Sequence, residues 1–142
     1  MRDTGPPGEP VIEAKDLGLT FDTNDGPVHA LTGVNLTIEK GDFVSFIGPS
    51  GCGKTTFLRC VAALEHPTSG TLTVNGMSPD DARQRRAYGY VFQAAGLYPW
   101  RTIAGNVKLP LEIMGFSKAE QDERVRNVLS LVDLEGFGKK YP

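Results

Sequence analysis

The feature that most constrains the fold is a nine-residue string, Gly-Pro-Ser-Gly-Cys-Gly-Lys-Thr-Thr, at positions 48–56. It fits a pattern of one glycine, four free positions, a second glycine, a lysine, and a serine or threonine. The preceding residues 43–47 are apolar and rich in β-formers, which predicts a buried strand. After the string, Phe57, Val61 and Leu64 recur at helical spacing. The sequence therefore predicts a glycine-rich loop between a strand and a helix.

A loop in this position is suited to bind phosphate. Glycines let the backbone curl round an anion and aim N–H groups inward, and a helix beginning near Lys54 adds unpaired N–H groups and its positive dipole end. Lys54 can reach the β- and γ-phosphates, the Thr55 hydroxyl can ligate Mg²⁺, and Thr56 can bond a phosphate oxygen. The candidate nucleotide-binding residues of the loop are Gly48, Pro49, Ser50, Gly51, Cys52, Gly53, Lys54, Thr55 and Thr56. The alternative is a turn that only joins a strand to a helix.

Length and composition fit one globular domain. The chain has 142 residues, of which 39% are hydrophobic and 23% charged. Residues 1–10 are crowded with Gly and Pro, which predicts a flexible tail and not a signal peptide. No apolar run approaches ~20 residues, so no membrane span is expected. A net charge of −2 argues against a nucleic-acid binder, and the basic cluster at 83–86 is expected to be a solvated face.

The two cysteines fit a reducing compartment better than a disulfide framework. Cys60 is expected to be a small core residue on the helix. Cys52 lies where a helix starts in an anion site, so we expect it to react with thiol reagents and to be protected by nucleotide. His29 and His66 stand far apart in the sequence without clustered ligands, so no metal site is expected on them.

Strands are predicted on both sides of the loop. Residues 11–22 and 34–38 read as two strands joined through a turn rich in Asn, Asp, Gly and Pro, which gives an antiparallel preamble. After the loop helix, residues 71–76 read as another strand. The apolar residues 91–92 are then expected to place Gln93 at the end of a further strand.

The second half of the chain predicts helices. Thr102 can cap a helix that is bent at Pro110. Ser117 and Glu120 form a Ser-x-x-Glu capping box ahead of an amphipathic helix that we expect to end near Gly136. We therefore expect a helical subdomain to begin at about residue 100.

One string in this half has two interpretations. Residues 129–135, Leu-Ser-Leu-Val-Asp-Leu-Glu, resemble the apolar run plus Asp that holds Mg²⁺ in many phosphate-loop ATPases. They also continue the helical repeat that starts at the capping box. On that interpretation Asp133 lies at a frayed helix end, and the metal site is the alternative.

Taken together, these strings resemble the ATP-binding subunit of an ABC transporter. The match runs across almost the whole chain, and the strings that carry it are residues 17–21, 48–76, 88–93 and 109–115. The resemblance implies an α/β fold of the phosphate-loop (RecA-like) class, as in an ABC nucleotide-binding domain. It implies a truncated domain, which contains an antiparallel β preamble and the start of a helical subdomain. It implies a flexible tail at 1–10, an incomplete ATP-binding core at 11–100 and the start of the helical subdomain at 101–142.

The resemblance also implies roles for single residues in binding MgATP. Phe21 matches the aromatic residue that stacks on adenine. Gln93 matches the glutamine that contacts Mg²⁺ and the attacking water and reports nucleotide state to the membrane subunits. The catalytic residues would then be Lys54 and Gln93, and the metal ligands Thr55 and Gln93.

Partners and solute follow from the same resemblance. Residues 99–102, Pro-Trp-Arg-Thr, and 106–112 are similar to importer subunits for nitrate, sulfonate and taurine, with importers of thiamine precursors as the alternative. The protein would lie on the cytoplasmic face of the membrane, against an integral-membrane permease subunit. A second ATP-binding subunit would pair with it head to tail, and a solute-binding protein would act indirectly. No nucleic acid is implied.

Some family strings do not occur in these 142 residues: the LSGGQ-like signature, the apolar strand ending in Asp and Glu, and the switch His. Without a water-activating base and these charge stabilisers, hydrolysis by this chain alone is not expected. An open apolar edge at 43–47 also predicts marginal stability or self-association. Two alternatives remain: a truncated non-catalytic nucleotide-binding or interaction module, and a soluble non-transport ABC ATPase.

Overall fold

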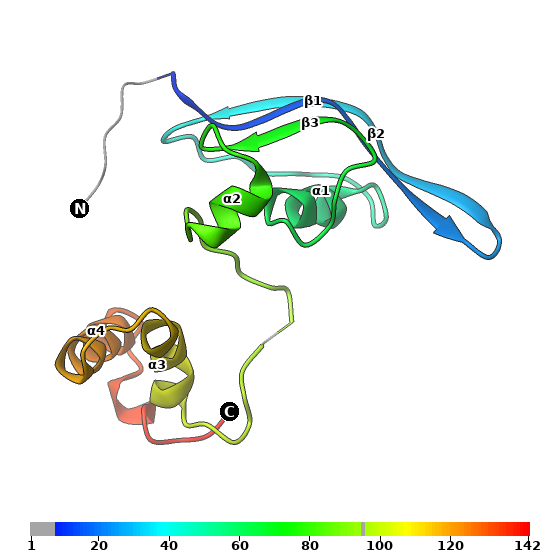
Figure 1. Ribbon diagram of the computed structural model, residues 1–142. Coiled ribbons are helices and arrows are strands. Elements are labelled where there is room, and N and C mark those ends of the chain that lie inside the picture. The colour runs from blue at the N-terminus through cyan, green and yellow to red at the C-terminus, as the bar shows by residue number, and fades with distance from the viewer. Residues whose placement is uncertain (1–7, 95) are drawn as a thin grey trace. The chain divides into compact units, whose positions relative to one another are not determined.

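The computed structural model describes residues 8–94 and 96–142. The elements in chain order are β1 Pro10–Thr23, β2 Gly26–Glu39, α1 Lys54–Val61, β3 Ser69–Val74, α2 Pro79–Gln84, α3 Ile103–Ile113, α4 Lys118–Leu131 and the 3₁₀ turn η1 Glu135–Phe137. They belong to two compact units, Met1–Tyr90 and Val91–Pro142, and each is described by itself. Figure 1 labels the elements along the chain.

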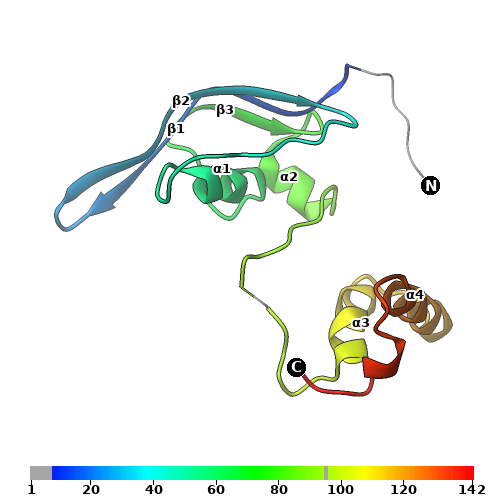
Figure 2. The ribbon, with the colours of Figure 1, turned by 180° about the vertical axis from the view of Figure 1, so that it is seen from behind.

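The first unit contains a three-stranded antiparallel sheet in the order β2-β1-β3. The β1–β2 hairpin runs from the pair Pro10 and Glu39 to the pair Thr23 and Gly26, with the predicted turn between them. Both views show α1 and α2 on the same side of this sheet (Figures 1 and 2). The antiparallel preamble is confirmed, although β2 begins eight residues earlier than the strand predicted at 34–38.

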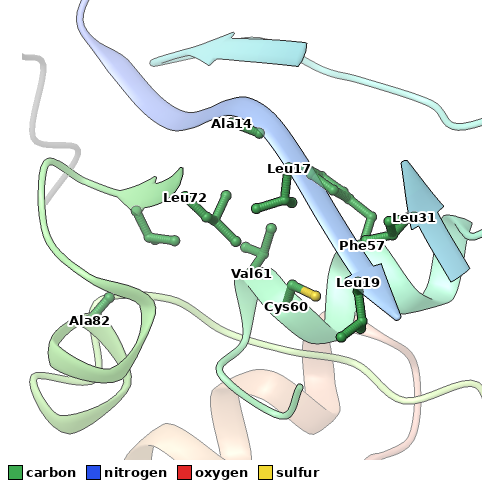
Figure 3. Close-up of a cluster of buried hydrophobic side chains, with 10 residues drawn as sticks. Ala14, Leu17, Leu19, Leu31, Phe57, Cys60, Val61, Leu72 and Ala82 are labelled. Carbon is green, nitrogen blue, oxygen red and sulfur yellow. The ribbon is translucent and has the colours of Figure 1, made fainter. Parts of the chain in front are cut away.

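The core of this unit lies between the sheet and α1. The helix buries Phe57, Cys60 and Val61, which are spaced i, i+3 and i+4 and therefore share one helical face. They pack against Leu17 and Leu72 from the sheet (Figure 3). Leu17 and Cys60 are fully buried. This packing fixes the start of α1, and so the loop before it, against the sheet.

The strand predicted at 43–47 is wrong: these residues are irregular. Phe43 and Ile47 are each 95% exposed, and only Phe46 packs on the core, with its ring centroid 5.5 Å from that of Phe57. A buried parallel strand needs hydrogen-bonded neighbours on its edges. Among the residues that the structure describes, none pairs with this segment, so its apolar pattern alone does not make a strand.

The strand predicted at 91–92 is also wrong. Val91 is 95% exposed, and Gln93 lies in a bend instead of at a strand end. The sheet of the described residues lies entirely within the first unit. The predicted helix after the loop also stops early, at Val61, which leaves Leu64 outside it and half-exposed.

Helix α2 was not predicted. Ser78 caps it, and its hydroxyl accepts a hydrogen bond from the N–H of Asp81 at 3.1 Å. Pro79 occupies the first turn, where its fixed φ suits a helix start. The carboxylates of Asp80 and Asp81 interact favourably with the positive end of the helix dipole. The string Ser-Pro-Asp-Asp was the available signal. The basic cluster at 83–86, which begins in the last turn of α2, is exposed, as expected.

The second unit is a pair of helices whose predicted caps are both present. The Thr102 hydroxyl accepts from the N–H of Gly105 at 3.1 Å, and Ser117 and Glu120 form the capping box of α4. An ion pair between Lys108 and Asp122 joins the two helices. No helix in the described ranges is long and apolar enough to cross a membrane.

The end of α4 differs from the prediction. The helix stops at Leu131 instead of near Gly136, and Asp133 follows with φ of +57°. Asp133 therefore lies just past a helix end, which is where the helical interpretation of residues 129–135 placed it.

Candidate phosphate-binding site

The loop before α1 presents a set of unpaired backbone donors. In the described part of the chain, five N–H groups around the start of α1 donate no hydrogen bond, and they belong to Gly51, Gly53, Lys54, Thr55 and Thr56. The first paired N–H of the helix is that of Phe57, which donates to the Gly53 carbonyl at 2.8 Å. Unpaired N–H groups at a helix start, together with the positive dipole end, form a site for an anion.

Two glycines shape this loop. Gly51 has φ of +80° and Gly53 has φ of +93°, conformations that L side chains rarely adopt. At Gly53 the backbone also lies close to β2. A Cβ there would come 2.8 Å from the Ala30 carbonyl oxygen and 2.8 Å from Leu31 Cδ2, whereas a Cβ at Gly51 would meet nothing within 4 Å. The strand β2 is therefore one wall of the loop, a contact that the sequence did not predict.

The Lys54 ammonium lies over the same loop. Its Nζ donates to the carbonyl oxygens of Gly48 and Pro49, each at 2.7 Å, and lies 3.4 Å from Cys52 Sγ. An ammonium carries three donors, and here all of them face the loop. A bound phosphate would give Lys54 a stronger, charged acceptor at the same place.

The hydroxyls beside Lys54 suit a magnesium nucleotide. Among the described residues the side chains of Thr55 and Thr56 have no hydrogen-bond partner, and Thr55 is exposed at the first turn of α1. Mg²⁺ in such sites takes oxygen ligands and is held by one or two protein groups plus substrate phosphates. The described residues contain no cluster of three or more His, Cys, Asp or Glu side chains. Thr55 is the residue of this site that could hold Mg²⁺.

The two cysteines have opposite environments. Cys52 is exposed on the loop, whereas Cys60 is fully buried on α1. Burial raises the pKa of the Cys60 thiol, and the nearby Glu65 carboxylate raises it further. Cys60 is the core residue that its helical position predicted, and it is inert toward aqueous reagents in the folded chain.

Phe21 lies on the hairpin that borders the loop. It is 37% exposed and pairs with Val28 across β1 and β2. Two residues earlier on β1, Leu19 pairs with Leu31, the residue that packs against Gly53. The pairing of β1 with β2 shifts register between Leu19 and Thr20, so the structure does not place the Phe21 side chain against the loop, and its stacking on adenine stays a prediction.

Gln93 belongs to the second unit, in an exposed bend. The structure does not relate it to the loop of the first unit, so its contact with metal and water stays a prediction. The second unit also contains a buried polar residue that the sequence did not single out, Asn106. Its only sequence signal is an amide among apolar residues of an amphipathic helix.

Comparison with known proteins places the chain in a family. Residues 31–142 match the family described as ABC transporter. The chain is 41% identical over 138 residues to the methionine import ATP-binding protein MetN of Bordetella pertussis, covering 93% of this chain and 38% of that protein. It is 38% identical over 131 residues to the Fe(3+) ions import ATP-binding protein FbpC of Escherichia coli O157:H7, covering 92% of this chain and 36% of that protein.

The fold gives the same result. The chain superposes on a dimeric post-hydrolysis state of the ATP-binding cassette MJ0796 bound to ADP and Pi, with a TM-score of 0.79 and 33% identity over 92% of this chain and 61% of that one. The predicted fold class, an incomplete ABC nucleotide-binding domain, is confirmed. The chain spans well under half the length of the two curated relatives. On this evidence the chain belongs to the ABC transporter family.

Proposed function

We propose that the chain is the nucleotide-binding part of the ATP-binding subunit of an ABC importer. The observation that carries the proposal is the group of unpaired N–H donors at the start of α1, with the Lys54 ammonium over them. Both curated relatives described above are named as import ATP-binding proteins, and a solved relative holds ADP and Pi.

In this proposal the residues of the loop bind and orient MgATP. The N–H groups of Gly51 and of residues 53–56 hold the phosphate chain by hydrogen bonds, which require no side-chain movement. Lys54 leaves the Gly48 and Pro49 carbonyls and pairs with the β- and γ-phosphates. Thr55 would hold Mg²⁺, which neutralises charge on the phosphates when bound, and Thr56 would bond a phosphate oxygen. Phe21 would stack on adenine.

Gln93 would complete the site in the assembled protein by contacting metal and attacking water, as the resemblance implies. The proposed partners are an integral-membrane permease and a second ATP-binding subunit, with a solute-binding protein acting indirectly, at the cytoplasmic face of the membrane.

The relatives' names point to methionine or ferric iron as the solute instead of nitrate, sulfonate or taurine. The oxoanion branch rests on the strings at residues 99–102 and 106–112, so the proposal names no solute.

A phosphate-release assay tests how far the chemistry resides in this chain. With MgATP we expect no release above that of Lys54→Ala, because the base and signature strings do not occur in the sequence. Release that depends on Lys54 would contradict this expectation and direct attention to Asp133 as a substitute metal ligand. Bound ATP without release supports nucleotide binding by the chain, and no bound ATP would contradict the proposal itself.

One observation favours a second candidate, a non-catalytic nucleotide-binding or interaction module. Phe43 and Ile47 are each 95% exposed on a segment without paired backbone among the described residues. Such a segment is a template for pairing with another strand. Binding of nucleotide without turnover, together with self-association through this segment, would support that candidate.

A further inference from the structure

We propose that Asn106 is the positioning residue for the loop at 98–102, the segment that follows Gln93. Asn106 is 8% exposed and is the one buried polar residue of the described chain. A buried amide without hydrogen bonds would destabilise the fold, so its partners indicate what it holds in place.

All of its side-chain hydrogen bonds go to the backbone of this loop. Asn106 Oδ1 accepts from the Tyr98 N–H at 2.8 Å. Asn106 Nδ2 lies within donor distance of three carbonyl oxygens, those of Tyr98 at 3.1 Å, Arg101 at 3.0 Å and Thr102 at 3.0 Å. One side chain therefore ties both ends of a five-residue turn to α3.

The loop carries the side chains of Tyr98, Trp100 and Arg101. Trp100 is 71% exposed, and its ring centroid is 4.9 Å from that of Tyr98. Arg101 Nη2 pairs with Glu112 Oε2 at 2.7 Å, while its Nη1 is buried without a partner among the described residues. With Leu109 and Ile113 of α3, these residues line a cavity of about 300 Å³.

The helix to which Asn106 belongs is also held by contacts outside this loop. The N–H groups of Ile103 and Ala104 donate to the carbonyls of Lys140 and Gly138 at 2.8 and 2.9 Å, and the Lys108–Asp122 ion pair joins α3 to α4. Loss of the Asn106 amide should therefore release the loop while α3 remains folded. Release of the loop with α3 still folded would indicate a positioning role for Asn106, whereas loss of α3 would indicate a general structural role.

The biological meaning of the inference rests on the proposed function, because the loop begins five positions after Gln93, the residue proposed to contact the metal and the attacking water. The test requires no nucleotide. Failure of the proposed function would appear as absent ATP binding, whereas failure of this inference would appear in the loop alone.

The experiment measures the exchange rate of the Tyr98 amide by NMR and the fluorescence anisotropy of Trp100, the only tryptophan of the chain. In Asn106→Ala we expect Tyr98 exchange to rise about tenfold, since a buried hydrogen-bond network is lost, and Trp100 anisotropy to fall. Asn106→Asp keeps an acceptor for the Tyr98 N–H but no donor for the carbonyls. The exchange rate of the Tyr98 amide in this variant should therefore lie between those of the unaltered chain and Asn106→Ala. The control is Asn127→Ala, an exposed asparagine on α4.

Two results would overturn the inference. One is unchanged Tyr98 exchange and Trp100 anisotropy in Asn106→Ala with the helical circular dichroism signal retained. The other is loss of the helical signal of α3 and α4 in both Asn106 variants, because Asn106 would then stabilise the helix pair and not the loop.

Discussion

Replacement of Gly53 by alanine should damage the phosphate loop far more than the same change at Gly51. Both glycines have positive φ, so alanine at either position costs about 1–2 kcal/mol in backbone strain. Only at Gly53 does the new Cβ meet backbone, 2.8 Å from the Ala30 carbonyl oxygen. Overpacking of that kind adds about 1–3 kcal/mol. The expected loss of unfolding free energy is therefore about 2–5 kcal/mol for Gly53→Ala and about 1–2 kcal/mol for Gly51→Ala.

Thermal unfolding followed by circular dichroism measures this difference, because a loss of 1 kcal/mol lowers Tm by roughly 4–8 °C in a unit the size of Met1–Tyr90. Binding of a fluorescent ATP analogue, measured in parallel, should be lost in Gly53→Ala and weakened in Gly51→Ala. Equal destabilisation by the two substitutions would refute the reasoning, because it would mean that β2 does not form a wall of the loop.

Three further predictions follow from single contacts. Hydrogen bonds from Ser117 lower the pKa of the Glu120 carboxyl, so its stabilisation is present above the ordinary pKa of a glutamate and is lost as pH falls through the lowered pKa of the folded state. As the pH is lowered through the range in which Glu120 becomes protonated, the melting temperature of Glu120→Gln should fall less than that of the unaltered chain. A thiol reagent should label Cys52 and not Cys60 in the folded chain, and MgATP should slow that labelling as followed by mass spectrometry; rapid labelling of both would contradict the burial of Cys60. Ile47→Lys should reduce self-association in sedimentation velocity, because a charge on an exposed apolar edge opposes pairing.

The elements that the sequence predicted correctly are those set by local chemistry. Thr102 and Ser117 cap helices because a short hydroxyl side chain satisfies the first helical N–H groups whatever the surroundings. The start of α1 at Lys54 follows from the glycines before it. The β1–β2 hairpin follows from its alternation and its turn residues.

The errors occur where structure depends on distant partners. Residues 43–47 have strand composition, but a strand forms only with hydrogen-bonded neighbours, and none pairs with them among the described residues. The wall that Leu31 makes for Gly53 and the cluster around Asn106 depend on contacts between segments. Periodicity and propensity carry no signal for such contacts. Gln93 and Phe21 were identified by resemblance, and their roles remain predictions.

The most direct test of the central claim, that residues 48–56 bind nucleotide phosphates, is isothermal titration of the chain with MgATP. We expect saturable binding by the unaltered chain, and at least about tenfold weaker binding by Lys54→Ala, since a charge-assisted hydrogen bond contributes about 1.5–3 kcal/mol. Lys15→Ala is the matched control, because Lys15 pairs with Glu13 on β1 away from the loop and should leave the affinity unchanged. Equal affinity in the chain and in Lys54→Ala, or no binding by a folded chain, would contradict the account.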